Sequence, residues 1–522
     1  MATVDAIIVG AGHNGLVAAT LLARAGRRVL VLERAAHPGG AAVSSAPFAG
    51  VDARISRYAY LVSLFPSRLL SDLGIEVEMR RRSVSSYTPL GDAGVLVCDD
   101  EERTRESITR TLGDDRAATD IERFGAMTAA VAQRVFPTLT EPLLSREAFR
   151  RRLGDEQAWR ALFEHPLSQV LEDAIDSDLA RGIVATDALI GTFADTADPQ
   201  LRQNRCFLYH VIGNGTGRWD VPVGGMGALS TALAHAAQQA GAEIRLNAPV
   251  VSIQADSHGV EVTTAEGNRH AGRHLLANVA PSVLAGLRGD PPPALAPEGS
   301  QLKLNLLLSK LPRLRDESLT REEAFAGTFH VNESYEQLRA AYAQAAAGAI
   351  PALPPCEAYC HTLTDASILG PELRASAVHT LTVFVLHMPA RLFRLDHEEA
   401  KRAAVAATLR SLDSVLAEPI EGCLLRTPTG AACLEAHTPI ELEAELGLPG
   451  GHIFHRDLSW PYAESEHEIG RWGVETARPN VWICGAGARR GGAVSGIPGH
   501  NAAHAVIEAD ARRAPRTAER SL

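Results

Sequence analysis

Over the first forty residues, the apolar positions follow the pattern of a buried strand, then the spacing of a helix, and then the pattern of a second strand. Residues 4–9 form a short apolar run, which predicts a buried strand of a parallel sheet. A glycine-rich turn follows, and then an Ala/Leu-rich stretch at helical spacing that ends at Gly26. A second β-branched run covers 28–32, and Glu33 directly follows it. The pattern therefore predicts a strand, a helix and a parallel second strand.

Helical patterns dominate the next long stretch, from about 85 to 217, with few strands. The pattern then predicts a helix over 228–240 and strands over 243–246 and 249–253.

A proline run at 291–293 marks a boundary. Beyond it, 301–308 and 379–387 have the pattern of strands, which we assign to a separate sheet. Near the C-terminus, 481–484 predicts one more strand, followed by a glycine-rich turn and a helix that begins near His500.

The first turn contains Gly10, Gly12 and Gly15 in the spacing GxGxxG. Gly10 suits a tight turn, Gly12 lets backbone approach a pyrophosphate, and Gly15 lets helix and strand pack closely. Glu33 stands where an acid accepts hydrogen bonds from ribose hydroxyls. The motif therefore predicts a dinucleotide site, in which we also include His13, Asn14 and Arg34.

The residues after Glu33 carry a resemblance to known families. Gly39 and Gly40, followed by Ala41, resemble the extended N-terminal pattern of glutathione-reductase-like flavoproteins. The letters GHNGL at 12–16 resemble the phytoene-desaturase-like flavoproteins, and among them the branch named after pyridine nucleotide-disulphide oxidoreductase domain protein 2. The resemblance implies a non-covalently bound FAD and an α/β fold: a glutathione-reductase-like, Rossmann-type FAD domain with a split, mixed α+β substrate domain.

Two later segments extend the resemblance. The stretch 222–253 is similar to the family's second flavin-binding segment, which implies that backbone at Val250 meets the adenine. The closing motif implies that its backbone lies against the isoalloxazine, and it contributes Gly485, Gly492, Val494, Gly496 and Ile497. The closing motif departs from the family pattern at Arg489 and Arg490, which stand where family members commonly have His-Pro.

We therefore expect a discontinuous FAD-binding domain over 1–85, 218–290 and 450–510. A substrate or cap domain is expected over 86–217 and 291–449, with a charged tail over 511–522. At 522 residues and 46% hydrophobic content, the chain can bury two cores.

The net charge and the cysteine content limit the partners, the chemistry and the location that we expect for this chain. The net charge of −11 argues against nucleic acid as a partner. The seven cysteines include no CxxC pair, so we expect no disulphide-reductase chemistry, no metal site and a reducing, cytoplasmic location. No apolar run reaches membrane-spanning length. The arginine runs at 80–82 and 150–152 are typical of solvated faces, although either could contact anionic lipid at a membrane surface.

Two side chains are candidates for catalysis. Lys303 lies in the strand pattern at 301–308, at a position that resembles the lysine through which amine-oxidase relatives hold a water against the flavin. The alternative is a solvated strand lysine, because alternation places polar residues outward. His500, at the expected helix start, is the second candidate, and its alternative is an anion-binding or capping group.

Three functions fit these observations. The first, which we favour, is an FAD-dependent dehydrogenase, desaturase or related isomerase acting on an apolar or extended small molecule, such as a carotenoid-like polyene. The second is an amine-oxidase-like enzyme that uses oxygen, which Lys303 favours. The third is a non-catalytic lipid-binding protein of the same architecture, which the intact glycine motifs argue against.

Overall fold

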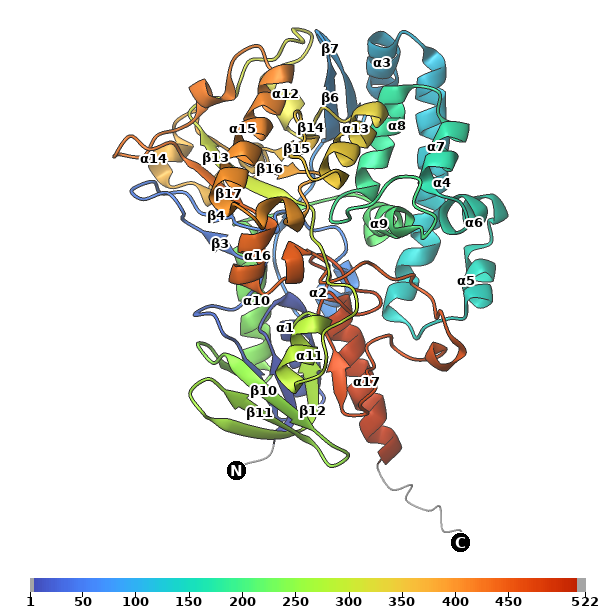
Figure 1. The fold of residues 1–522 in the computed structure, drawn as a ribbon, viewed down its shortest axis with the longest axis vertical. Helices are drawn as coiled ribbons and strands as arrows, with labels where there is room; N and C mark the ends of the chain where they lie inside the picture. The colour runs from blue at the N-terminus through green and yellow to red at the C-terminus, as the bar shows by residue number, and fades with distance from the viewer. Residues whose placement is uncertain (1–3, 514–522) are drawn as a thin grey trace.

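A computed structural model describes residues 4–513 of the chain. Figure 1 shows two lobes, with the N-terminus and the end of the last helix at the lower one. Each lobe is built around a seven-stranded sheet. None of the helices in this part of the chain combines the length and the apolar character that crossing a bilayer requires.

The sheet of the lower lobe joins three separate parts of the chain. Its strands follow the order β10-β11-β12-β1-β2-β9, and β18 also pairs with β12. The bounds are β1 Val4–Val9, β2 Val29–Leu32, β9 Glu243–Arg245, β10 Val250–Ala255, β11 Val260–Thr264, β12 Arg269–Ala277 and β18 Val481–Ile483. β9, β2, β1, β12 and β18 are parallel, while β10 and β11 form an antiparallel extension.

Helices cover both faces of this sheet. α1 (His13–Arg24), α10 (Met226–Gln239) and α17 (Ile497–Arg513) share one apolar core with β1 and β2. α11 (Pro281–Arg288) packs on the other face. These elements bury the apolar residues that the sequence pattern places at helical and strand spacing.

The upper sheet is mostly antiparallel, in the order β17-β13-β16-β15-β14-β6-β7. Its strands are β6 Val84–Leu90, β7 Ala93–Cys98, β13 Leu302–Leu308, β14 Thr328–Val331, β15 Cys356–Tyr359, β16 His379–Val385 and β17 Leu434–His437. Two small pairs stand apart: β3 Ser44–Ser45 with β4 Ile55–Ser56, and β5 Met79–Arg80 with β8 Val221–Pro222.

Two groups of helices complete the upper lobe (Figure 1). Beside the upper sheet lie α12 Arg321–Phe325, α13 Tyr335–Ala346, α14 Pro371–Arg374, α15 His397–Val415 and α16 Pro439–Leu446. The second group of helices follows β7 in the chain: α3 Glu101–Leu112, α4 Asp115–Val135, α5 Arg146–Leu153, α6 Glu156–Phe163, α7 Leu167–Ala174, α8 Asp178–Ala185 and α9 Arg202–Val211. The short α2 (Ser67–Asp72) packs its Leu69 into the core of the lower lobe.

The elements expected from the sequence differ from the structure chiefly at their ends. The helix expected near His500 begins at Ile497, and it continues to Arg513, beyond the expected start of the tail at 511. Residues 514–522 of that tail lie outside the described residues. β13 and β16 belong to a sheet separate from that of β1 and β2, as the sequence predicts.

The crossing of α1 and α17 depends on Gly499. A Cβ built at this residue would overlap the carbonyl oxygen of Asn14, and Val17 would lie 3.1 Å away. We expect Gly499→Ala to lower the free energy of unfolding by about 1–3 kcal/mol, because backbone on α1 cannot yield as a flexible side chain can.

Gly286 on α11 is the matched control, because a Cβ there meets nothing within 4 Å. Gly286→Ala should be neutral or stabilise the protein by about 0.4–1 kcal/mol. Thermal and denaturant unfolding of the two variants measure the difference. Equal stability would show that α1 and α17 do not pack this closely.

Candidate active site

A cavity of about 1050 Å³ extends from the glycine turn of the lower lobe to the upper sheet. This volume is at the upper end of the range for small-molecule sites. Many of the residues expected from the sequence line it: Gly10, Gly12, His13, Asn14, Glu33, Arg34, Gly40, Ala41, Val250, Lys303 and Val494. The cavity therefore joins the predicted dinucleotide motif to the predicted substrate region.

The glycine turn is shaped by Asn278, which directly follows β12. Its side-chain amide donates a hydrogen bond of 3.0 Å to the carbonyl of Gly10, whose φ of 98° favours glycine. A Cβ at Gly12 would lie 2.9 Å from the same amide nitrogen, and one at Gly15 would overlap the Gly10 carbonyl. Gly15 therefore serves packing and does not line the cavity.

α1 presents its N-terminus to the cavity. Gly12 caps the helix without a side-chain hydrogen bond, so first-turn N–H groups lack an internal partner. Such groups, together with the helix dipole, favour an anion. This end of the cavity suits a pyrophosphate.

Glu33 lies at the end of β2, nearly buried. Its carboxylate accepts hydrogen bonds from the backbone N–H groups of Ala11 (2.6 Å) and Ala35 (2.9 Å). A carboxylate has about four acceptor positions, so two remain for ribose hydroxyls. The neighbouring Arg34 lines the cavity edge but donates to the carbonyl of Glu445, away from the ribose position.

Several buried polar atoms of the cavity wall have no partner in the protein: His13 Nδ1, Asn14 Oδ1 and Ser45 Oγ. Burial lowers the pKa of His13 to about 4, so the ring is neutral. Its Nε2 lies 3.0 Å from the carbonyl of Ala493, which only accepts, so Nε2 carries the proton and Nδ1 is an acceptor. Unpartnered buried groups of this kind fit a polar ligand such as FAD.

The other predicted glycines accommodate protein side chains. Gly492 (φ 110°) and Gly496 (φ 68°) face the rings of Tyr209 and Phe65, and Gly485 packs against Asn278. Gly39 packs against Val43 and Ser230. None of these glycines lines the cavity, and neither does the buried Ile497. Val494 alone of the closing motif's predicted residues does so.

The two arginines of the closing motif point away from the cavity. Arg490 is buried and donates to the backbone carbonyls of Thr138 (2.9 Å) and Trp472 (2.7 Å). Arg489 forms ion pairs with Glu464 and Glu468. The two arginines therefore anchor neighbouring backbone and do not line the cavity.

His500 does not face the cavity, contrary to the sequence-based expectation. Because α17 begins three residues earlier than expected, His500 lies inside its first turn. The ring packs against His504, with centroids 4.3 Å apart, and against Trp472. Burial lowers the pKa of His500 to about 4, and the geometry gives it no contact with a ligand in the cavity.

Lys303 is buried, so the interpretation as a solvated strand residue is wrong. The polar face of β13 exists as predicted, but residues 56 and 57 cover it. The Lys303 ammonium donates to the carbonyls of Ser56 (3.1 Å) and Arg57 (2.7 Å) and to Asn305 Oδ1 (2.8 Å). All three of its protons are thereby used. Burial lowers the pKa of Lys303 to about 7.

Sequence reasoning missed the inner wall of the cavity. Tyr60 lies 4.8 Å from the Tyr359 ring between centroids, and Lys303 Nζ is 5.2 Å from the Tyr60 centroid. Tyr359 donates a hydrogen bond to Glu357, whose pKa burial raises to about 8. Lys303 lies on β13, Glu357 and Tyr359 lie on β15, and Tyr60 lies in a loop, so no single spacing in the sequence links the wall.

Arg82 is also part of this wall, although the run at 80–82 has the pattern of a solvated face. Its guanidinium carbon lies 5.7 Å from the Tyr359 ring centroid, and its buried Nε has no hydrogen-bond partner. Arg80 remains exposed, as expected from the pattern.

Two family models match the chain. One, described as an NAD(P)-binding Rossmann-like domain, matches residues 8–68, and the other, described as a flavin containing amine oxidoreductase, matches residues 68–308. A putrescine oxidase variant, 18% identical and covering 98% of this chain and 99% of its own, superposes with a TM-score of 0.60. The two proteins share a fold.

Relatives are similar over nearly the full length. An uncharacterized protein of Mycobacterium tuberculosis is 49% identical, with 98% of each chain covered. A mouse protein named pyridine nucleotide-disulfide oxidoreductase domain-containing protein 2 is 29% identical over 96% of this chain and 93% of its own. The chain therefore belongs to one family with the mycobacterial protein, and it is an FAD-dependent oxidoreductase.

Proposed function

We propose that this enzyme dehydrogenates an extended, largely apolar small molecule, in the manner of the phytoene-desaturase-like flavoproteins. The volume and the largely apolar lining of the cavity carry the proposal. Apart from the residues of the glycine turn, the lining of the cavity includes these apolar side chains: Ile121, Ile183, Ile190, Val84, Val97, Trp219, Ile453 and Phe454. A large cavity with such a lining favours an apolar substrate.

FAD, when bound, supplies a two-electron acceptor for such a reaction. The residues that would hold it are the backbone of Gly12 and His13 for the pyrophosphate, Glu33 for the ribose and the backbone of Val250 for the adenine. No cysteine of the described chain lines the cavity, so a thioether link to the flavin has no candidate there. We propose that the FAD is bound non-covalently.

Lys303 contributes as a positioning residue in this proposal. By holding the carbonyls of Ser56 and Arg57, it fixes the segment that carries Tyr60 into the cavity. The aromatic rings of Tyr60, Tyr359 and Phe384 then form one surface, with Tyr60 and Phe384 6.1 Å apart between centroids. An ordered surface of this kind orients a substrate for reaction.

Oxidation of an amine by oxygen is the second candidate. The family model described as a flavin containing amine oxidoreductase and the buried lysine on the cavity wall favour it. The protons of the Lys303 ammonium are taken by protein acceptors, so the lysine has none left for the water that the resemblance implies.

Anaerobic mixing of the flavin-loaded enzyme with candidate substrates distinguishes the two functions. We expect bleaching of the flavin absorption bands by an apolar polyene or a long-chain compound with an activated C–H bond. Primary amines such as putrescine should leave the bands unchanged. Bleaching by amines, and by none of the apolar compounds, would reverse the assignment.

The role of Glu33 is tested by Glu33→Gln. Loss of charge weakens hydrogen bonds worth about 1.5–3 kcal/mol each, so the Kd for FAD should rise by about tenfold or more. Arg34→Gln is the matched control and should change the Kd little, because Arg34 binds a carbonyl of α16. Flavin content after desalting and fluorescence titration measure both. Equal losses in the two variants would remove Glu33 from the ribose position.

Lys303→Met tests the positioning role. Three buried acceptors lose the Lys303 donor, although the Arg57 carbonyl keeps Asn305 Nδ2 and Asn305 Oδ1 keeps Thr382 Oγ1, so the free energy of unfolding should fall by about 1–3 kcal/mol while FAD content stays normal. Flavin reduction by substrate should slow by about tenfold, because Tyr60 loses its support. Lys310 forms an exposed ion pair with Glu418, so the control variant Lys310→Met should lower the free energy of unfolding by less than about 1 kcal/mol. Normal stability combined with slow re-oxidation by oxygen would instead indicate the water-holding role.

A further inference from the structure

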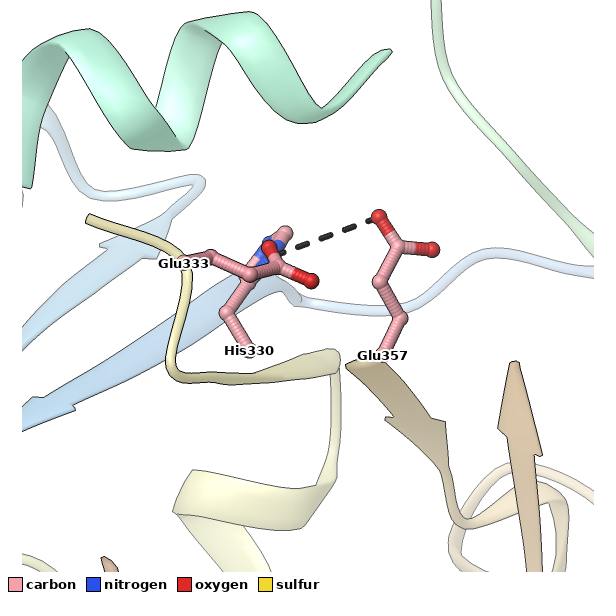
Figure 2. A group of neighbouring side chains, drawn as sticks. All are labelled: His330, Glu333 and Glu357. Carbon is pink, nitrogen blue, oxygen red and sulfur yellow. Dashed lines mark hydrogen bonds and ion pairs between the residues drawn. The ribbon is translucent and has the colours of Figure 1, made fainter. Parts of the chain in front are cut away.

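The upper sheet brings one histidine and two glutamates together at the inner wall of the cavity, and strand pairing adds Glu357 to a histidine and a glutamate that lie three residues apart in the sequence. His330 on β14 and Glu357 on β15 are directly paired in the antiparallel register, so their side chains share a face of the sheet. Asn332, with a φ of 55°, turns the chain after β14 and returns Glu333 to the same place. Figure 2 shows the three side chains meeting.

The geometry of this His330–Glu333–Glu357 cluster is that of a set of metal ligands. His330 Nδ1 and one carboxylate oxygen of each glutamate all lie within 4.8 Å of one another. The ring nitrogen contacts Glu333 Oε2 and is 4.0 Å from Glu357 Oε1. An imidazole nitrogen with two carboxylates is a ligand set typical of Zn²⁺, Mn²⁺ and Fe²⁺.

Within the described part of the chain, no arginine or lysine forms an ion pair with the two glutamates, although Arg82 on the same wall acts on Glu357 from a longer distance. Among residues 4–513, His330 is the one basic group within 4.0 Å of either glutamate carboxylate. The side chains of Glu333 and Glu357 are 0% and 3% exposed, and removing carboxylates from water is costly unless a cation or hydrogen bonds compensate.

An independent observation points to a ligand. Glu333 Oε1 is buried and has no hydrogen-bond partner of normal geometry among residues 4–513, although Thr186 lies near this carboxyl. In Figure 2 the Glu333 carboxylate lies against the His330 ring and is directed toward Glu357. Tyr359 holds Glu357 Oε2, which leaves Oε1 facing the cluster. Such support from an outer residue is common around metal ligands.

We propose that His330, Glu333 and Glu357 bind one divalent transition-metal ion, a site separate from that of FAD. His330 and Glu357 line the cavity, so the remaining coordination positions of the metal would face a bound substrate. A metal ion held by three protein ligands keeps open coordination positions, and such sites typically take an oxygen or nitrogen of a substrate. The earlier expectation of no metal rested on cysteine spacing alone, which does not register ligands assembled by strand pairing.

Zinc binding to the full-length, FAD-loaded protein tests the proposal. After chelator treatment and dialysis, calorimetric titration with Zn²⁺ and metal analysis should give one ion per chain. Glu357→Gln and His330→Gln should each weaken binding by at least tenfold. Normal FAD content in both variants verifies their fold, and because the measurement counts bound metal, it does not depend on which substrate the enzyme oxidises.

The matched control removes a pair of histidines that lies outside the cluster. His500 and His504 lie one turn apart on α17, where two imidazoles could hold zinc adventitiously. The double variant His500→Gln/His504→Gln should bind zinc as the unchanged protein does. Loss of binding in this variant, with binding retained in Glu357→Gln and His330→Gln, would overturn the proposal.

X-ray absorption at the zinc edge is measured on the unchanged protein, so the result does not depend on whether a variant folds. We expect nitrogen and oxygen ligands at about 2.0–2.2 Å. Sulfur ligands at about 2.3 Å would place the zinc on cysteines and overturn the proposal. Absence of bound zinc after titration would overturn it as well.

Discussion

The packing of Asn278 against glycines is the constraint on which the flavin site depends. This side chain follows β12 and lies against Gly10, Gly12 and Gly15 of the first turn, and against Gly485 after β18. Its amide fixes the Gly10 carbonyl, and its backbone N–H donates to Val9. One residue thus joins the ends of three parallel strands. A side chain at any of these glycines would separate the strands whose ends form the cavity floor.

The N-terminal half of the site could be predicted because its signals are local. A strand, a turn and a helix that follow one another place Gly12 and Glu33 correctly whatever the rest of the chain does. Lys303 shows the limit of this reasoning. Alternation along β13 predicts which face the lysine occupies, but residues 56 and 57, far away in sequence, decide that this face is buried.

The C-terminal motif shows a different limit. Its glycines were expected to approach the flavin, yet Gly492 and Gly496 make room for Tyr209 and Phe65. A glycine signals that something lies close to the backbone and does not identify what lies there. The inner wall was missed for a third reason. His330 and Glu357 meet through strand register, and a single sequence contains no record of which strands pair.

The three-part construction of the lower sheet has a consequence for biosynthesis. β1, α1 and β2 are made before the rest of this sheet, and β18 and α17, which complete the sheet and cover α1, are made only after the strands of the upper sheet. Until then the apolar faces of the nucleotide-binding unit remain open to solvent. Exposed apolar surface of this kind favours aggregation of a nascent chain, and the core of the nucleotide-binding unit is complete only when the C-terminal elements dock.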